Sequence, residues 1–139
     1  MKSAWLLLTA IFFAGCGNPP GPPPVLSSKF SDIQQQTFNK SCAIGGCHDA
    51  GTQKALLCLT QDSCYNQLMN HPIQAIQGTR KFTKLVSPGN PDSSFLVYKL
   101  TITQTTIEYG TLMPQGFPPL PQNQIDAIKT WISNGAKND

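Results

Sequence analysis

The stretch that decides the fold of this chain is Ser41-Cys42-Ala43-Ile44-Gly45-Gly46-Cys47-His48. It places two thiols and an imidazole close together, and its paired glycines relax the backbone between the cysteines. Three kinds of site use such residues: a covalent haem site, a zinc site and a disulfide. Zinc would need four nitrogen or sulfur ligands in a compact set, and the only other histidine is His71. A zinc site is therefore hard to assemble from this chain.

Covalent haem attachment uses the same residue types in the same order. Two cysteines form thioethers with the porphyrin, and the histidine after the second cysteine ligates the iron. Once Cys47 is bonded at the porphyrin edge, the adjacent His48 can reach the iron from one face. The spacing here is C-x4-C-H, whereas the usual spacing is C-x2-C-H. The longer spacing is similar to that at some sites in certain multihaem cytochromes. We expect one haem c on Cys42 and Cys47, with a Cys42–Cys47 disulfide as the alternative.

The first residues have the features of an export signal. Lys2 supplies a positive charge, Trp5–Phe13 is an apolar run too short to span a bilayer, and Ala14-Gly15 precede Cys16. This arrangement resembles the lipobox of bacterial lipoproteins, which implies cleavage before Cys16 and lipidation of its sulfur. An ordinary secreted protein is the alternative. We expect a signal peptide at 1–15, a lipidated cysteine and proline-rich tether at 16–30, and a domain at 31–139.

The composition restricts the surroundings of this domain. The chain has 139 residues, and loss of Lys2 with the signal lowers its formal charge from +3 to +2. This charge gives no reason to expect a nucleic-acid partner. The expected location is outside the cytoplasm, on a bacterial membrane facing the periplasm or cell surface. Gly17 rather than aspartate follows Cys16, which favours the outer membrane under the usual sorting rule.

Helical patterns occupy four parts of the domain, and we expect an all-α fold. Ser31 is a suitable N-cap for a helix running toward Cys42. Thr60 could cap a helix at 61–70, and Asn90-Pro91-Asp92 could begin another. The clearest helix has apolar residues at helical spacing followed by Gly135, a typical C′ residue; its apolar positions are Ile125, Ile128, Trp131 and Ile132. Residues 101–109 (TITQTTIEY) are rich in β-branched residues and are compatible with a short extended stretch or a loop.

Four segments in order resemble bacterial monohaem cytochrome c domains, in particular the planctomycete-type cytochrome c family. They are the cysteine–histidine segment, residues 85–96 (LVSPGNPDSSFL), residues 112–116 (LMPQG) and residues 128–136 (IKTWISNGA). The resemblance covers nearly the whole domain. It implies a small cytochrome c-like fold of short helices and long loops around one haem. Its axial ligands would be His48 and Met113, with His71 or Met69 as alternative sixth ligands.

The remaining cysteines and basic residues have simpler interpretations. Cys58 and Cys64 are close in sequence, and in an oxidising compartment we expect a structural disulfide between them. Residues 80–84 (RKFTK) form the only basic cluster. It is most simply a solvated loop, although it could steer an acidic redox partner. Trp131 and Ile132 are expected in the core.

These patterns predict a membrane-anchored electron carrier without a catalytic residue. With both axial positions filled, the iron would have no open site for a substrate, and the partners would be redox proteins of unknown identity. The membrane would be reached through the lipid anchor alone. Two alternatives remain: a haem peroxidase or ligand sensor, which needs an open axial position, and a haem-free lipoprotein stabilised by disulfides.

Overall fold

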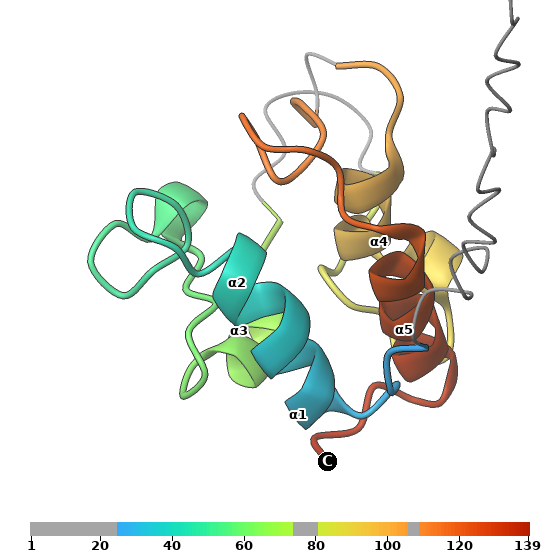
Figure 1. Ribbon diagram of the computed structural model, residues 1–139. Coiled ribbons are helices and arrows are strands. Elements are labelled where there is room, and N and C mark those ends of the chain that lie inside the picture. Colours follow the sequence, from blue (N-terminus) through green and yellow to red (C-terminus); the bar gives the residue numbers. More distant parts are fainter. Residues whose placement is uncertain (1–24, 74–80, 106–108) are drawn as a thin grey trace, which may run out of the picture.

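The computed structural model describes residues 25–73, 81–105 and 109–139. Within these ranges the chain is helical and forms no β-strand, in agreement with the expected all-α class. All four segments predicted as helical contain helix, although several of their ends differ (Figure 1). No helix in the described part of the chain is long and apolar enough to cross a bilayer. The predicted signal peptide, Cys16 and most of the tether lie outside these ranges.

The first helical segment is continuous but changes its winding. It consists of α1 (Phe30–Ile33), a π-helical turn η1 (Gln34–Phe38) and α2 (Asn39–Ser41). Its buried face includes Phe30, Ile33 and Phe38. At its end the Phe38 carbonyl accepts hydrogen bonds from the N–H groups of both Cys42 (2.9 Å) and Ala43 (2.8 Å). The helical segment therefore ends, after α2, where the cysteine–histidine segment begins.

The predicted N-cap of this helix is wrong. The helix begins at Phe30, so that Lys29 is the N-cap residue. The Lys29 side chain makes no capping hydrogen bond to the first turn. The free N–H groups are instead bound by Asp139: Phe30 donates to its carboxylate (2.9 Å) and Ser31 to its main-chain oxygen (2.9 Å). Figure 1 shows the C-terminus beside the start of α1. A residue distant in sequence thus replaces the local cap.

Helix α3 (Cys64–Asn70) is shorter than predicted. Residues 61–63 form a turn, and the Thr60 carbonyl accepts hydrogen bonds from the N–H groups of Ser63 (3.0 Å) and Cys64 (2.8 Å). The Tyr65 hydroxyl donates to the Ala136 carbonyl at 3.0 Å. This bond ties α3 to the chain after the last helix. A short 3-10 turn, η2 (Lys54–Leu56), lies between the cysteine segment and α3.

Helix α4 (Phe95–Thr101) follows a 3-10 turn, η3 (Pro91–Ser93). Asn90 caps this turn as predicted, because its side chain accepts a hydrogen bond from the Ser93 N–H (3.1 Å). Ser94 is fully buried, and its hydroxyl accepts from the Ser87 N–H and donates to the Asn90 carbonyl, both at 2.9 Å. These bonds give a physical reason for the serine at position 94, in the segment of residues 85–96 that resembles the cytochrome family.

Helix α5 (Gln122–Ser133) buries the apolar face predicted from its spacing, with Trp131 2% and Ile132 0% exposed. Gly135 has φ +95°, and its N–H donates to the Ile132 carbonyl (3.0 Å). The Ala136 N–H donates to the Trp131 carbonyl (2.9 Å). This pair of bonds is a Schellman motif, which confirms Gly135 as the C′ residue.

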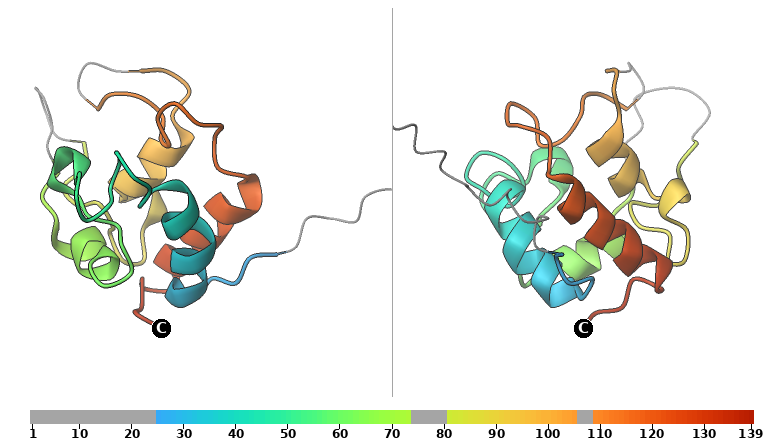
Figure 2. Two further views of the ribbon diagram at one scale, coloured as in Figure 1. Left: turned by 60° about the vertical axis from the view of Figure 1, so that its left-hand side comes forward. Right: turned by 45° about the vertical axis from the view of Figure 1, so that its right-hand side comes forward.

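Two groups of buried side chains make up the core. The larger group joins the first helical segment, α3, α4 and α5, and Figure 2 shows these helices packed around one centre. Its members are Phe30, Ile33, Phe38, Leu59, Cys64, Leu68, Val86, Leu96, Val97, Leu100, Leu120, Ile125, Ala127, Ile128, Trp131, Ile132 and Ala136. The smaller group consists of Ile73, Phe82, Leu85 and Tyr109. The residues predicted to carry chemistry surround a space that both groups border.

Candidate cofactor site

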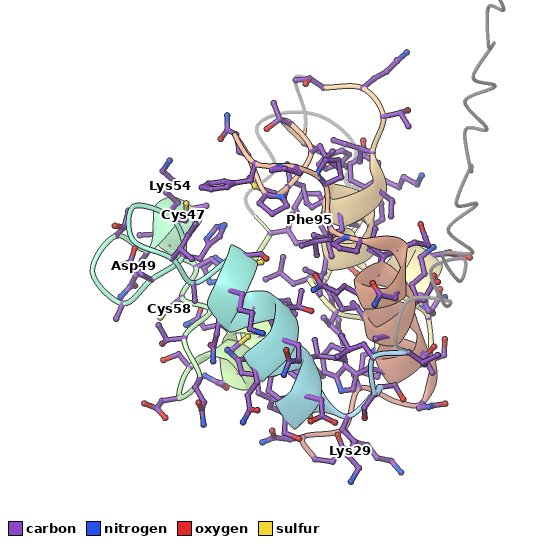
Figure 3. All side chains as sticks on the ribbon, viewed as in Figure 1. Lys29, Cys47, Asp49, Lys54, Cys58 and Phe95 are labelled. Carbon is purple, nitrogen blue, oxygen red and sulfur yellow. The ribbon has the colours of Figure 1, made fainter. Side chains whose placement is uncertain are left out.

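A cavity of about 430 Å³ brings together the residues predicted to bind haem. Cys42, Cys47 and His48 line it from one segment, and Met113 lines it from another. Figure 3 shows Cys47 on the loop after α2 and Phe95 across from it at the start of α4. The rest of the lining is mainly apolar and includes Leu57, Leu59, Ile73, Leu85, Phe95, Leu96 and Leu100. A mainly apolar ligand suits a cavity with this lining.

The loop of residues 42–57, here called the cysteine loop, accommodates the longer C-x4-C-H spacing. The His48 N–H donates to the Cys42 carbonyl (3.1 Å), and the Cys47 N–H donates to the Ile44 carbonyl (3.0 Å). In a C-x2-C-H segment, an α-helical turn would join the same two groups, because the histidine follows the first cysteine by four residues. The additional residues therefore bulge outward while the first cysteine and the histidine stay bonded.

Asp49 organises the bulged part of the cysteine loop. Its carboxylate accepts hydrogen bonds from the N–H groups of Gly46 (3.0 Å), Gly51 (2.8 Å) and Thr52 (3.0 Å). Hydrogen bonds from the Thr52 side chain and from these backbone groups lower the pKa of this carboxyl to about 2. The carboxylate is therefore charged at neutral pH, and it links the backbone before His48 to the backbone after it through these hydrogen bonds.

His48 is held in the form that can ligate a metal. Its Nδ1 lies 3.0 Å from the Lys54 carbonyl oxygen and 3.3 Å from that of Leu57. Because carbonyl oxygens only accept hydrogen bonds, Nδ1 carries the proton, and the Nε2 lone pair is free in the neutral ring. Burial lowers the pKa of His48, which favours the neutral ring. Hydrogen bonding of the second ring nitrogen is the usual support of a histidine ligand.

The two cysteines of the loop are close enough for Cys47 to influence the pKa of Cys42. Burial, with a smaller effect of the nearby Cys47, raises the pKa of the Cys42 thiol to about 12. Cys42 is therefore a neutral thiol beside an apolar wall. A thioether is likewise neutral, so a thioether at this position would introduce no charge into the cavity.

Met113 reaches the cavity from the loop between α4 and α5, whose residues 109–121 are here called the methionine loop. Its side chain lines the cavity and also packs against the larger core group. Its N–H donates to the Lys99 carbonyl on α4 (2.8 Å), and the peptide bond to Pro114 is cis. Met113 and His48 thus lie on the same cavity but come from separate parts of the fold.

The two alternative sixth ligands occupy different positions. His71 also lines the cavity, but its Nε2 lies 3.1 Å from the Ala55 carbonyl oxygen. Ligation through this nitrogen would require that hydrogen bond to break. Met69 packs against the larger core group and is not part of the cavity wall. Met113 and His71 therefore both reach the cavity, and His71 would have to give up a hydrogen bond to ligate through Nε2.

The predicted Cys58–Cys64 disulfide is not formed in the structure, where both residues are free thiols. The sulfur of Cys58 lies 3.2 Å from the Thr60 hydroxyl, and this contact lowers the pKa of Cys58. Cys64 is fully buried at the start of α3, and burial, with smaller effects of Cys42 and then Cys58, raises its pKa. The bridge remains a prediction for the oxidised protein.

The donor set fits a haem better than a metal ion bound by protein alone. Among the described residues, no three histidine, cysteine, aspartate or glutamate side chains gather as a metal site. A porphyrin supplies four nitrogens itself, so it needs only one ligand on each face, and His48 and Met113 are of the right chemical kinds. The two cysteines beside His48 would hold the porphyrin edge. These residues and the apolar lining are therefore compatible with haem c.

Sequence reasoning did not identify several residues that support this site. They are Lys99, which holds the methionine loop, Asp49, and the carbonyls of Lys54 and Leu57 that orient His48. Carbonyl contacts leave no trace in residue type, and Lys99 lies in a helix pattern that gives it no special role. Asp49 follows the cysteine–histidine segment directly, and its position in a glycine-rich turn was a signal that could have been used.

Comparison with known proteins yields no assignment: no family model matches the chain, and no curated protein and no solved structure matches it.

Proposed function

We propose that this chain is a membrane-anchored c-type cytochrome that carries single electrons through one haem bound to Cys42 and Cys47. Its axial ligands are His48 and Met113. The observation that carries the proposal is the state of His48, which lies beside both cysteines on an apolar cavity with Nδ1 bound to carbonyl oxygens. The resemblance to the planctomycete-type cytochrome c family in four ordered segments supports the same function.

The ligand pair explains why the proposed role is electron transfer. A haem with histidine on one face and methionine on the other has no vacant position for a substrate, and it supplies a one-electron iron couple. Met113 contributes a soft, neutral sulfur, which favours the reduced state. The apolar side chains keep water away and lower the local dielectric constant, which also disfavours the more highly charged oxidised state. Both effects predict a relatively high reduction potential.

Covalent attachment is the test of this proposal. The full chain, exported by cells that mature c-type cytochromes, should keep its haem on a denaturing, reducing gel and give a haem–pyridine absorption spectrum. Cys42→Ser combined with Cys47→Ser should abolish covalent haem. Cys58→Ser combined with Cys64→Ser is the matched control, because it removes the same number of thiols outside the attachment segment, and it should retain haem.

Two results would contradict the proposal. A wild-type protein without haem, or one that loses its haem on the denaturing gel, would remove the covalent site and leave a haem-free lipoprotein. A bound haem whose iron is five-coordinate and high-spin would leave an axial position open. That second result would make a peroxidase or ligand sensor the better interpretation.

A further inference from the structure

Lys99 on α4 holds the methionine loop at three points. Its ammonium donates to the carbonyl oxygens of Tyr109 (2.7 Å) and Thr111, and its own carbonyl accepts from the Met113 N–H (2.8 Å). The loop passes close to this ammonium at Gly110, where a Cβ would lie 3.5 Å from Nζ. One residue of α4 therefore binds the loop both before Met113 and at Met113.

The position of Lys99 is unusual for a lysine side chain. It is half-buried on the wall of the cavity, and burial lowers its pKa. Removing an ammonium from water is unfavourable unless polar groups replace the lost hydration. Here two main-chain carbonyls do so, and bonds from a charged donor are stronger than those between neutral groups. The burial of this charge is thus coupled to the conformation of the loop.

We propose that Lys99 is a positioning residue that sets the place of the Met113 sulfur at the haem. The inference rests on the proposed function. A methionine side chain has three rotatable bonds, so packing alone defines the position of its sulfur poorly. The backbone from which it extends must therefore be held. Lys99 holds it through the two carbonyls that precede Met113 and through the Met113 amide itself.

The consequence concerns how often the methionine is bound. With the loop held, the sulfur stays within reach of the axial position, and an external ligand has to displace it. With the loop released, the sulfur leaves more often. External ligands then enter faster, and the stabilisation of the reduced state by methionine decreases. The structure of α4 and the attachment of the haem through the cysteine loop are unaffected by this change.

The test compares three variants of the full, haem-loaded protein. Lys99→Met removes the ammonium but keeps most of the apolar stem, and Lys99→Arg keeps a cation that can donate to two carbonyls. Lys84→Met is the control, because Lys84 is an exposed lysine outside the cavity. The measurements are hydrogen exchange of the Met113 amide, the weak far-red charge-transfer band that methionine ligation gives the ferric protein, the rate of imidazole binding and the reduction potential.

Lys99→Met should retain covalent haem, while its Met113 amide exchange and its imidazole binding become about tenfold faster or more. Its far-red band should weaken and its potential should fall. Lys99→Arg should have nearly the amide exchange, imidazole-binding rate, far-red band and potential of the wild type. Lys84→Met should equal the wild type in all four measurements. If Lys99→Met behaves like Lys84→Met, Lys99 does not position the loop. Equal impairment of Lys99→Met and Lys99→Arg would also overturn the proposal, because donation to the carbonyls would then not matter.

Failure of this inference can be distinguished from failure of the proposed function. A wild-type protein without covalent haem or without the far-red band would contradict the haem site or the Met113 ligand. A wild type with both features, combined with a Lys99→Met variant unchanged in exchange and imidazole binding, would contradict only the role of Lys99.

Discussion

His48 illustrates how a residue becomes suited to its role through its immediate surroundings. Its place after Cys47 follows from the sequence, but its protonation state depends on two carbonyl oxygens supplied by Lys54 and Leu57. These contacts put the proton on Nδ1 and leave the lone pair of Nε2 available to a metal ion. The described residues offer no comparable polar contact to the Met113 side chain, so its proposed role depends on its presence on the same cavity wall.

Replacing Met113 tests the second axial ligand. Met113→Ala should leave the haem covalently attached, because the cysteines are unchanged. It should abolish the far-red band of the ferric protein and open a site for cyanide or imidazole. It should also lower the potential by roughly 100 mV or more, since axial ligands change haem potentials over a range of about 0.8 V. Absorption spectroscopy and a redox titration provide the measurements.

His71→Ala is the matched control, because His71 lines the same cavity. This variant should keep the band and the potential of the wild type. The opposite pattern, in which His71→Ala changes both and Met113→Ala changes neither, would show bis-histidine ligation. Electron transfer would remain the function in that event, because both axial positions would still be filled.

At the level of elements, local sequence signals and tertiary contacts share control of the helix ends. Asn90 and Gly135 act within their own turns, and the structure confirms both. The start of α1 differs, because Asp139 accepts from its first N–H groups and makes a Ser31 cap unnecessary. The cysteine loop is held by two kinds of hydrogen bond. The His48 N–H donates to the Cys42 carbonyl, and the Asp49 carboxylate accepts from the backbone of the glycine-rich turn.

The Asp49 carboxylate gives the cysteine loop a specific pH dependence. Its pKa in the folded protein is about 2, below the ordinary value of 3.8. The folded state thus binds its proton less readily than the unfolded chain. The stabilisation is fully present above pH 3.8 and is lost as the pH falls through about 2. Protection of the Gly46, Gly51 and Thr52 amides from hydrogen exchange should decrease in this interval, after correction for intrinsic exchange.

Asp49→Asn should reduce this protection already at pH 5 and remove the acidic transition of the loop, because the amide side chain does not ionise. Asp62→Asn, which makes the same change at an exposed position elsewhere, should leave the loop as it is in the wild type. A transition between pH 4 and pH 2 that persists unchanged in Asp49→Asn would show that another group controls the loop.

For the whole molecule, the main feature is a cavity bordered by helices and loops that are far apart in the sequence. The cysteine loop forms one part of its wall, and α4 and the methionine loop form another. The proposed attachment of the chain to a membrane would depend instead on residues before the described part. Cys16, which lies outside the described residues, remains the predicted lipidation site.

Replacing Cys16 tests the anchor independently of the haem. Cys16→Ser removes the sulfur that would carry the lipid, so the protein should be recovered as soluble or unprocessed material. Its haem spectrum should be unchanged, because the predicted tether separates the anchor from the domain. Cell fractionation and mass analysis provide the measurements. A Cys16→Ser protein of mature size that still sediments with membranes would contradict the lipid anchor.

Sequence reasoning reached the helical class and the approximate helices because these depend on local patterns, and the same kind of pattern named the proposed haem-binding residues. Apolar spacing predicts which face of α5 is buried, and the capping signals at Asn90 and Gly135 act over a few residues. The adjacency of Cys47 and His48 is likewise local. The order of the four segments and their resemblance to a cytochrome family then led to Met113, without any information on where its side chain lies.

Only the tertiary structure decided which of these residues share one cavity. It placed Met113 and His71 on the wall with His48, and it left Met69 packed against the larger core group, outside the cavity wall. It also revealed the carbonyls around His48 and the contacts of Lys99 with the methionine loop. The physical reason is that these contacts join segments distant along the chain and often involve main-chain oxygens, which every residue carries and no sequence pattern distinguishes.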